Sequence, residues 1–206
     1  MKMWSGRFRQ PLDPEFEKWQ RSFPFDQLLI KEEVTASTAH ARALQAAGVL
    51  TREELETIAN GLRHIAEHAD ELLPDDSEED VHHFIEKQLV AAIGEAGYKL
   101  HTGRSRNEQI ATDMRLYVRA QIDGLRLQIA ELVEVLITKA EKSGAAAMPS
   151  YTHLQRAEPV LVAHWLLAYC EMLFRDAGRL ADCRERLNVC PLGSGAIAGA
   201  TLKLDR

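Results

Sequence analysis

The feature that most constrains the fold is an apolar repeat that runs without a break over residues 107–142. Its apolar side chains recur at steps of mostly three or four residues, which is the spacing of one helix face: Ile110, Met114, Tyr117, Leu125, Ile129, Leu132, Leu136 and Ala140. A helix of that length would span about 50 Å at 1.5 Å per residue. Typical globular helices are much shorter, so the repeat predicts packing in a long helical bundle.

A second long helix is expected from Pro159 to about Leu187, as an antiparallel neighbour of the first.

Shorter helices are expected before residue 100. They would run from Asp13-Pro14 to about Trp19, from an Asp26 cap to near Gly48, from a capping box at Thr51–Glu54, and from Ser77 and Asp80 to Gly94 or Gly97. No segment shows convincing strand alternation, so strand content should be low. The sequence therefore predicts an all-α fold. Residues 1–100 would form a helical N-terminal domain, and residues 101–206 an incomplete long-helix bundle.

Composition excludes several classes of protein. The chain has 206 residues, a formal net charge of −6 and 46% hydrophobic residues, which argues against a disordered chain. No apolar run is long enough to span a bilayer, and the first residues lack the apolar core of a signal peptide. The acidic balance argues weakly against a nucleic-acid partner. The three cysteines suggest neither a zinc site nor a disulfide framework, and they fit a cytoplasmic protein.

The most unusual polar segment is 101–107, His-Thr-Gly-Arg-Ser-Arg-Asn, directly before the first long helix. The free N–H groups at a helix start favour anions. Arg106 could grip a carboxylate through two hydrogen bonds, and Asn107 could bind one from the cap position. The alternative is an ordinary polar loop with an asparagine cap.

A second polar segment, 148–159, contains Thr152 and His153 side by side. A histidine titrates near neutral pH and can move a proton, while a threonine hydroxyl can orient a substrate carboxylate. The alternative is a histidine satisfied by a local backbone carbonyl.

A third segment, 78–86, places His82 and Glu86 four residues apart on one helix face. Two ligands are only half of a metal site, so no metal is expected. The carboxylate could orient the imidazole, or the two could form a plain ion pair. The glycine-rich tract 191–199 could cradle an anion through its backbone, although it lacks the lysine of a nucleotide loop.

Taken together, these segments resemble the argininosuccinate lyases of the fumarase/aspartase superfamily, to which the δ-crystallins of lenses also belong. The resemblance covers the chain from Trp4 to Arg206. It rests on WSGRF at 4–8, the segment from Ser22 to Asp26, EEDVHHFIE at 78–86, HTGRSRNEQIATD at 101–113, YTHLQRAEP at 151–159 and PLGSGAIAG at 191–199. Two positions depart from the usual pattern: Ser5, where glycine is usual, and Glu108, where aspartate is commoner.

The resemblance implies β-elimination of argininosuccinate to L-arginine and fumarate, a step of arginine biosynthesis that needs no metal and no cofactor. Ser22, Asn107 and Thr152 would bind substrate together with Arg106. His153 would take part in proton transfer as acid or base, directly or through a partner. His82 and Glu86 would be supporting residues near the site.

The family's signature loop, Gly-Ser-Ser-x-Met-Pro-x-Lys-x-Asn, does not occur in these 206 residues. The resemblance also implies a homotetramer whose sites are shared among three subunits. We therefore expect this chain to be inactive alone and to associate through its apolar helix faces. Two alternatives remain: another lyase of the superfamily, such as adenylosuccinate lyase or fumarase, and a structural protein of the crystallin type. A generic helical interaction module would explain the periodicity but not segment 101–107.

Overall fold

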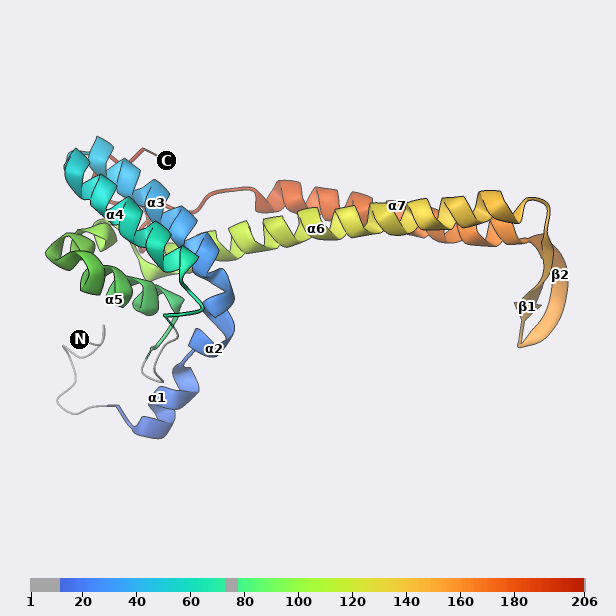
Figure 1. The fold of residues 1–206 in the computed structure, drawn as a ribbon, viewed down its shortest axis with the longest axis horizontal. Coiled ribbons are helices and arrows are strands. Elements are labelled where there is room, and N and C mark those ends of the chain that lie inside the picture. The colour runs from blue at the N-terminus through green and yellow to red at the C-terminus, as the bar shows by residue number, and fades with distance from the viewer. Residues whose placement is uncertain (1–11, 73–77, 206) are drawn as a thin grey trace. The chain divides into compact units, whose positions relative to one another are not determined.

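The computed structural model describes residues 12–72 and 78–205, and it divides the chain into two compact units (Figure 1). Unit 1 comprises the residues up to Met114 together with Cys190–Arg206, and unit 2 comprises Arg115–Val189. The expected WSGRF motif and the predicted helix start at Ser77 lie outside the described residues. Each unit is described here by itself.

Unit 1 is built from helices. Its elements are α1 (Pro14–Gln20), α2 (Phe23–Asp26), η2 (Gln27–Leu29), α3 (Ile30–Ala46), α4 (Arg52–Glu67), α5 (Val81–Ile93), η3 (Gly94–His101) and the first turns of α6 (Arg106–Ser143). Local signals set several ends. The Asp13 side chain caps α1, Thr51 and Glu54 form the predicted capping box, and Gly94 ends α5 with a φ of 72°.

The apolar core of unit 1 lies where α3, α4 and α5 pack together. Its fully buried side chains come from one face of each helix: Leu44, Ile58, Leu62, Ile65, Phe84, Ile85 and Leu89. The approach of α4 to α5 is close at Gly61, where an added Cβ would lie 2.7 Å from Leu89 Cδ1. This core fixes α5, and α5 carries His82 and Glu86.

Unit 2 consists of the rest of α6, a two-stranded antiparallel hairpin and α7 (Val162–Leu187). Strand β1 (Ala147–Thr152) pairs with β2 (Gln155–Leu161), with an irregularity in register between Pro149 and Tyr151. The two helices lie side by side and antiparallel (Figure 1). Arg119 donates to Asn188 Oδ1, and Arg184 forms a two-pronged ion pair with Asp123 at 2.6 and 2.9 Å. The predicted antiparallel arrangement is confirmed.

The all-α class and the low strand content are confirmed, but two local predictions were wrong. Pro159 does not begin the second long helix; it pairs with Pro149 in the hairpin, and α7 begins at Val162. The Asp26 side chain does not cap the helix that follows it in sequence, because its carboxylate accepts from Val81 N at the start of α5 and from the Ser22 hydroxyl. The small strand content is confined to β1 and β2, whose position the sequence did not indicate. The three cysteines are free thiols, and no helix among the described residues could cross a membrane.

Candidate active site

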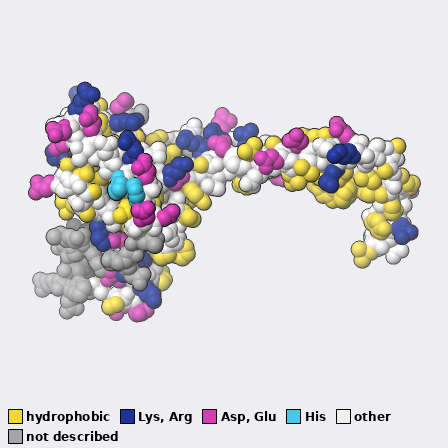
Figure 2. Space-filling view, in the orientation of Figure 1, with side chains coloured by type: hydrophobic (Ala, Val, Ile, Leu, Met, Phe, Trp, Pro, Cys, Tyr) yellow, Lys and Arg dark blue, Asp and Glu magenta, His cyan; other side chains and the backbone are white. Residues whose placement is uncertain are grey.

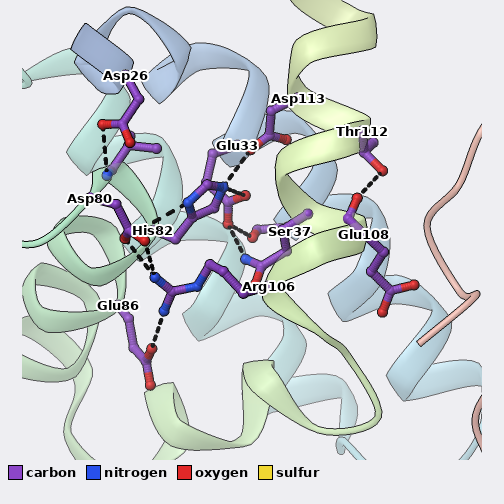
Figure 3. A network of polar contacts seen from close by, with 12 residues as sticks. Asp26, Glu33, Ser37, Asp80, His82, Glu86, Arg106, Glu108, Thr112 and Asp113 are labelled. Carbon is purple, nitrogen blue, oxygen red and sulfur yellow. Dashed lines mark hydrogen bonds and ion pairs between the residues drawn. The ribbon is translucent and has the colours of Figure 1, made fainter. Parts of the chain in front are cut away.

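The N-terminus of α5 carries a carboxylate that holds the Arg106 guanidinium. The Asp80 side chain caps α5 by accepting from His83 N at 2.7 Å. It also accepts from Arg106 Nη1 at 2.6 and 2.5 Å, while Arg106 Nη2 lies 3.9 Å from Glu86 Oε2 (Figure 3). Arg106 thus meets two carboxylates of its own chain. A cavity of about 350 Å³ opens beside Arg106 and Glu86, between α5 and η3.

His82 points from α5 into the interior of unit 1, where acidic groups surround it (Figure 3). Its Nε2 lies 2.9 Å from Asp113 Oδ2 and 3.7 Å from Glu33 Oε2, and its Nδ1 lies 3.8 Å from Asp80 Oδ1. The side chains of His82, Glu33 and Asp113 are at most 2% exposed. A carboxylate therefore does orient the His82 imidazole, but it is that of Asp113 and not that of Glu86, which faces Arg106.

Burial shifts the protonation of this cluster. It raises the pKa of Glu33 and that of Asp113 each to about 7, and it lowers the pKa of His82. Arg104, whose side chain is 4% exposed, lies 3.8 Å from Glu33 Oε1 and opposes the rise in the pKa of Glu33. Ligand atoms of Glu33, His82 and Asp113 lie within 4.8 Å of one another, which is close enough to hold a metal ion.

Ser22 is tied to the same end of α5 through Asp26. The Ser22 hydroxyl donates to Asp26 Oδ2 at 2.6 Å, and Asp26 Oδ1 accepts from Val81 N at 3.0 Å. The Ser22 backbone N–H donates to Glu79 O at 3.0 Å. These bonds hold the half-buried Ser22 beside the helix end that carries Asp80 and His82.

Asn107 lies exposed in the first turn of α6, next to a carboxylate held by the glycine-rich tract. Glu108 Oε2 accepts from Gly193 N at 2.7 Å and Gly195 N at 2.8 Å, and Glu108 Oε1 accepts from Ser105 N at 2.9 Å. The tract 191–199 is thus an anion cradle, and its anion is Glu108 of the same chain. These bonds fasten the tract to segment 101–107.

Thr152 and His153 lie in unit 2, where the hairpin turns. Thr152 pairs with Gln155, so His153 and Leu154 form a two-residue loop. Both have positive φ, 49° and 61°, a combination that favours Asn-Gly and costs other residues roughly 1–2 kcal/mol each. All four residues are exposed. A histidine held in a strained, exposed turn is a candidate functional group.

Of the predicted site residues, the structure brings Ser22, His82, Glu86 and Arg106 together in unit 1 around the start of α5. Asn107 follows Arg106 in the same unit, and Thr152 and His153 lie in the other unit. The sequence does not single out the buried polar groups that surround His82 and Arg106 in unit 1: Glu33, Asp80, Arg104 and Asp113. The signal was present on α6, whose buried residues at the start are all polar, namely Glu108, Gln109, Thr112 and Asp113.

Comparison with known proteins identifies relatives over the whole chain. A family model described as lyase matches residues 6–206. The chain is 66% identical to the argininosuccinate lyase of Koribacter versatilis, with all of this chain and 44% of that protein covered. It is 50% identical to the argininosuccinate lyase of Caldanaerobacter subterraneus subsp. tengcongensis, with 47% of that protein covered. The chain thus spans less than half the length of these relatives.

Solved structures share the fold. An EDDS lyase in complex with formate superposes with a TM-score of 0.76 at 29% identity, over 95% of this chain and 39% of that one. A fumarate lyase from Mesorhizobium sp. BNC1 gives a TM-score of 0.70 at 26% identity, over 90% of this chain and 44% of that one.

Proposed function

The chain belongs to the lyase family, and we propose that it forms the N-terminal part of an argininosuccinate lyase. The reaction is β-elimination: a base removes a proton from the carbon beside a carboxylate, and the C–N bond to the guanidino group then breaks. The products are fumarate and L-arginine. The observation that carries the proposal is 66% identity over all 206 residues to an enzyme of that name.

The proposed roles follow from the charge that the reaction develops. Negative charge spreads into the substrate carboxylate after proton removal, so prearranged donors stabilise it. Arg106, Asn107 and Thr152 are the proposed donors, and Ser22 is a further substrate-binding residue. His153 moves the proton, and its strained turn supports this role.

His82 and Glu86 support the site indirectly. His82 is too buried to meet a substrate, but it lies 3.8 Å from the carboxylate that binds Arg106. Glu86 lies 3.9 Å from the same guanidinium. Both would therefore act by placing Arg106.

The active assembly is proposed to be a cytoplasmic homotetramer of a longer chain, with each site drawing residues from several copies. The exposed apolar side chains of α6 and α7 support association. Residues 1–206 alone are expected to lack activity, because the signature Ser and Lys of the family do not occur among them.

The test is a fusion of residues 1–206 to the remaining C-terminal part of the Koribacter versatilis argininosuccinate lyase. We expect the fusion to release fumarate from argininosuccinate, and residues 1–206 alone to release none. The fusion is also assayed with adenylosuccinate and with fumarate hydration. A folded fusion that acts on one of these and not on argininosuccinate would contradict the proposal.

The matched variants are Thr152→Val and His153→Asn in that fusion. Each removes one functional group with little change in size, and each should lower kcat/KM by 100-fold or more, on the order of general acid–base and oxyanion contributions. Unchanged turnover in both variants would remove these residues from the mechanism. Retention of fold without any turnover in the parent fusion would favour the crystallin-type alternative.

A further inference from the structure

The interior of unit 1 buries more negative than positive charge. Glu33 and Asp113 lie there, and among residues 12–72 and 78–205 one buried guanidinium, that of Arg104, lies close to Glu33. Arg106 does not compensate them, because Asp80 binds it. Buried ions need partners, so this cluster requires one more positive charge. That charge can be a proton or a metal ion.

The hydrogen bonds of Glu33 show where a proton would lie. Glu33 Oε1 accepts from the Ser37 hydroxyl and from Gln109 Nε2, the latter at 3.0 Å. Glu33 Oε2 and Asp113 Oδ1 are both buried without a hydrogen-bond partner among the described atoms. Two oxygens that only accept cannot satisfy each other. One proton between the carboxyls turns one into a donor and satisfies both groups.

We propose that Glu33 and Asp113 share one proton, and that this carboxyl pair positions His82 and, through Asp80, the Arg106 guanidinium. Asp113 Oδ2 accepts from His82 Nε2 at 2.9 Å, and His82 Nδ1 lies 3.8 Å from Asp80 Oδ1. Figure 3 shows these side chains converging from α3, α5 and α6. Glu33 and Asp113 are positioning residues, because neither is accessible to a substrate.

The surroundings favour a proton shared by the two carboxyls over a proton on His82 and over a bound metal ion. Burial raises the pKa of both carboxyls and lowers that of His82, so His82 is the weaker base. Ligand atoms of Glu33, His82 and Asp113 lie within 4.8 Å of one another, so the two carboxyls are close neighbours. A metal ion would be repelled by the Arg104 guanidinium, 3.8 Å from Glu33. Among the described residues, the charged or titratable groups that act on the cluster are Arg104, His82, Asp80, Asp26, Glu32, Glu86 and Arg106.

Infrared difference spectroscopy on residues 1–206 tests the proton directly and needs no turnover. At pH 6 the wild-type chain should show the C=O band of one protonated carboxyl, and Glu33→Gln should abolish it. The control is Glu78→Gln. Glu78 is also buried, but its Oε1 forms an ion pair with Lys87 Nζ at 2.5 Å, so this variant should leave the band unchanged. A wild-type spectrum without the band would overturn the proposal, because the proton would then lie on His82 or be replaced by a metal ion.

A thermal-shift series with Zn²⁺ and Mg²⁺ after chelation separates those two outcomes. No shift is expected with either ion. A rise in Tm that Glu33→Gln removes would show a metal site and overturn the proposal.

The positioning part rests on the proposed function and is tested in the active fusion. The neutral amide introduced by Glu33→Gln can donate to Asp113 permanently, so this variant should keep kcat within about twofold at pH 6.5. In the parent fusion KM should rise at alkaline pH as the shared proton leaves, and this rise should be absent in Glu33→Gln. An identical pH profile of KM in both proteins would contradict positioning, even if the infrared band is present. An inactive parent fusion would instead count against the proposed function.

Discussion

The two units use apolar and polar side chains in opposite ways. In unit 1, fully buried apolar residues form a core and a polar cluster is also buried beside it. In unit 2, large apolar side chains remain exposed along both helices: Leu125, Leu127, Leu132, Val135, Ile137, Trp165, Leu167, Tyr169, Met172 and Phe174. Figure 2 shows apolar side chains gathered near the hairpin end of this unit. Apolar periodicity therefore marks a buried core in unit 1 and an exposed apolar surface in unit 2.

The largest expected effect comes from truncating one phenylalanine in each unit. Phe84 is 0% exposed and Phe174 is 53% exposed. Phe84→Ala should lower the free energy of unfolding by about 3–5 kcal/mol, whereas Phe174→Ala should change it by about 0.5 kcal/mol or less in protein dilute enough to be monomeric. Urea unfolding of both variants measures this contrast. Equal losses would mean that unit 2 buries Phe174 in solution.

A pH effect should be confined to unit 1. His40 is buried and its Nε2 lies 3.0 Å from Thr102 O; burial lowers its pKa to about 4. Because the unfolded chain binds the proton more tightly, the His40 contribution is lost as the pH falls from about 6.5 to about 4. The loss is at most about 3 kcal/mol.

Glu33 works in the opposite direction. Its pKa is raised to about 7, so its contribution falls as the pH rises from about 4.5 to about 7. Stability curves of His40→Gln and Glu33→Gln against pH separate the two. His40→Gln should remove the loss of stability that occurs as the pH falls from about 6.5 to about 4. Glu33→Gln should remove the loss of stability that occurs as the pH rises from about 4.5 to about 7. Parallel curves for wild type and both variants would refute these assignments.

Association should depend on unit 2. Leu125 and Leu132 lie seven residues apart on one face of α6 and are 47% and 48% exposed. Residues 1–206 should form oligomers, and Leu132→Lys should weaken association by about tenfold or more, since it places a charge in an apolar interface. Light scattering over a concentration series measures this. A monodisperse wild-type monomer would contradict the expectation.

The smallest effect concerns a helix cap in unit 1. Thr51 accepts from Glu54 N at 3.1 Å, so Thr51→Ala should cost about 1 kcal/mol. Thr57→Ala, on the exposed face of the same helix, is the control and should cost about 0.5 kcal/mol or less. Similar losses in both would show that the capping box adds nothing.

Local signals made much of the fold predictable. The capping box at Thr51, the Asp13 cap and the Gly94 end act within one helical turn, so sequence alone places them. The predicted helix from about Asn107 to Lys142 agrees with α6, because a long apolar repeat has one compatible structure. The hairpin at 147–161 was missed, because its turn carries His153 and Leu154 where Asn-Gly would be the usual signal.

Candidate residues were predictable where a motif named them, but their partners were not. His82 has Glu86 at helical spacing, yet it bonds to Asp113, which lies 31 residues away and approaches only in the folded unit. Ile110 and Met114 begin the apolar repeat of α6, and they are 42% and 46% exposed. The buried face of α6 at this point is polar, so hydrophobicity alone selected the wrong side.

The central claim is that functional groups of unit 1 and unit 2 meet between different copies of a longer chain. It is tested by mixing two inactive fusions, Asn107→Ala and His153→Asn, after joint unfolding and refolding. Random assembly should restore about one quarter of the activity. Each site takes Asn107 from one copy and His153 from another, and each of these two residues is intact in half of the copies. No activity in the mixture, with both variants folded and assembled, would show that each site uses both residues of a single copy.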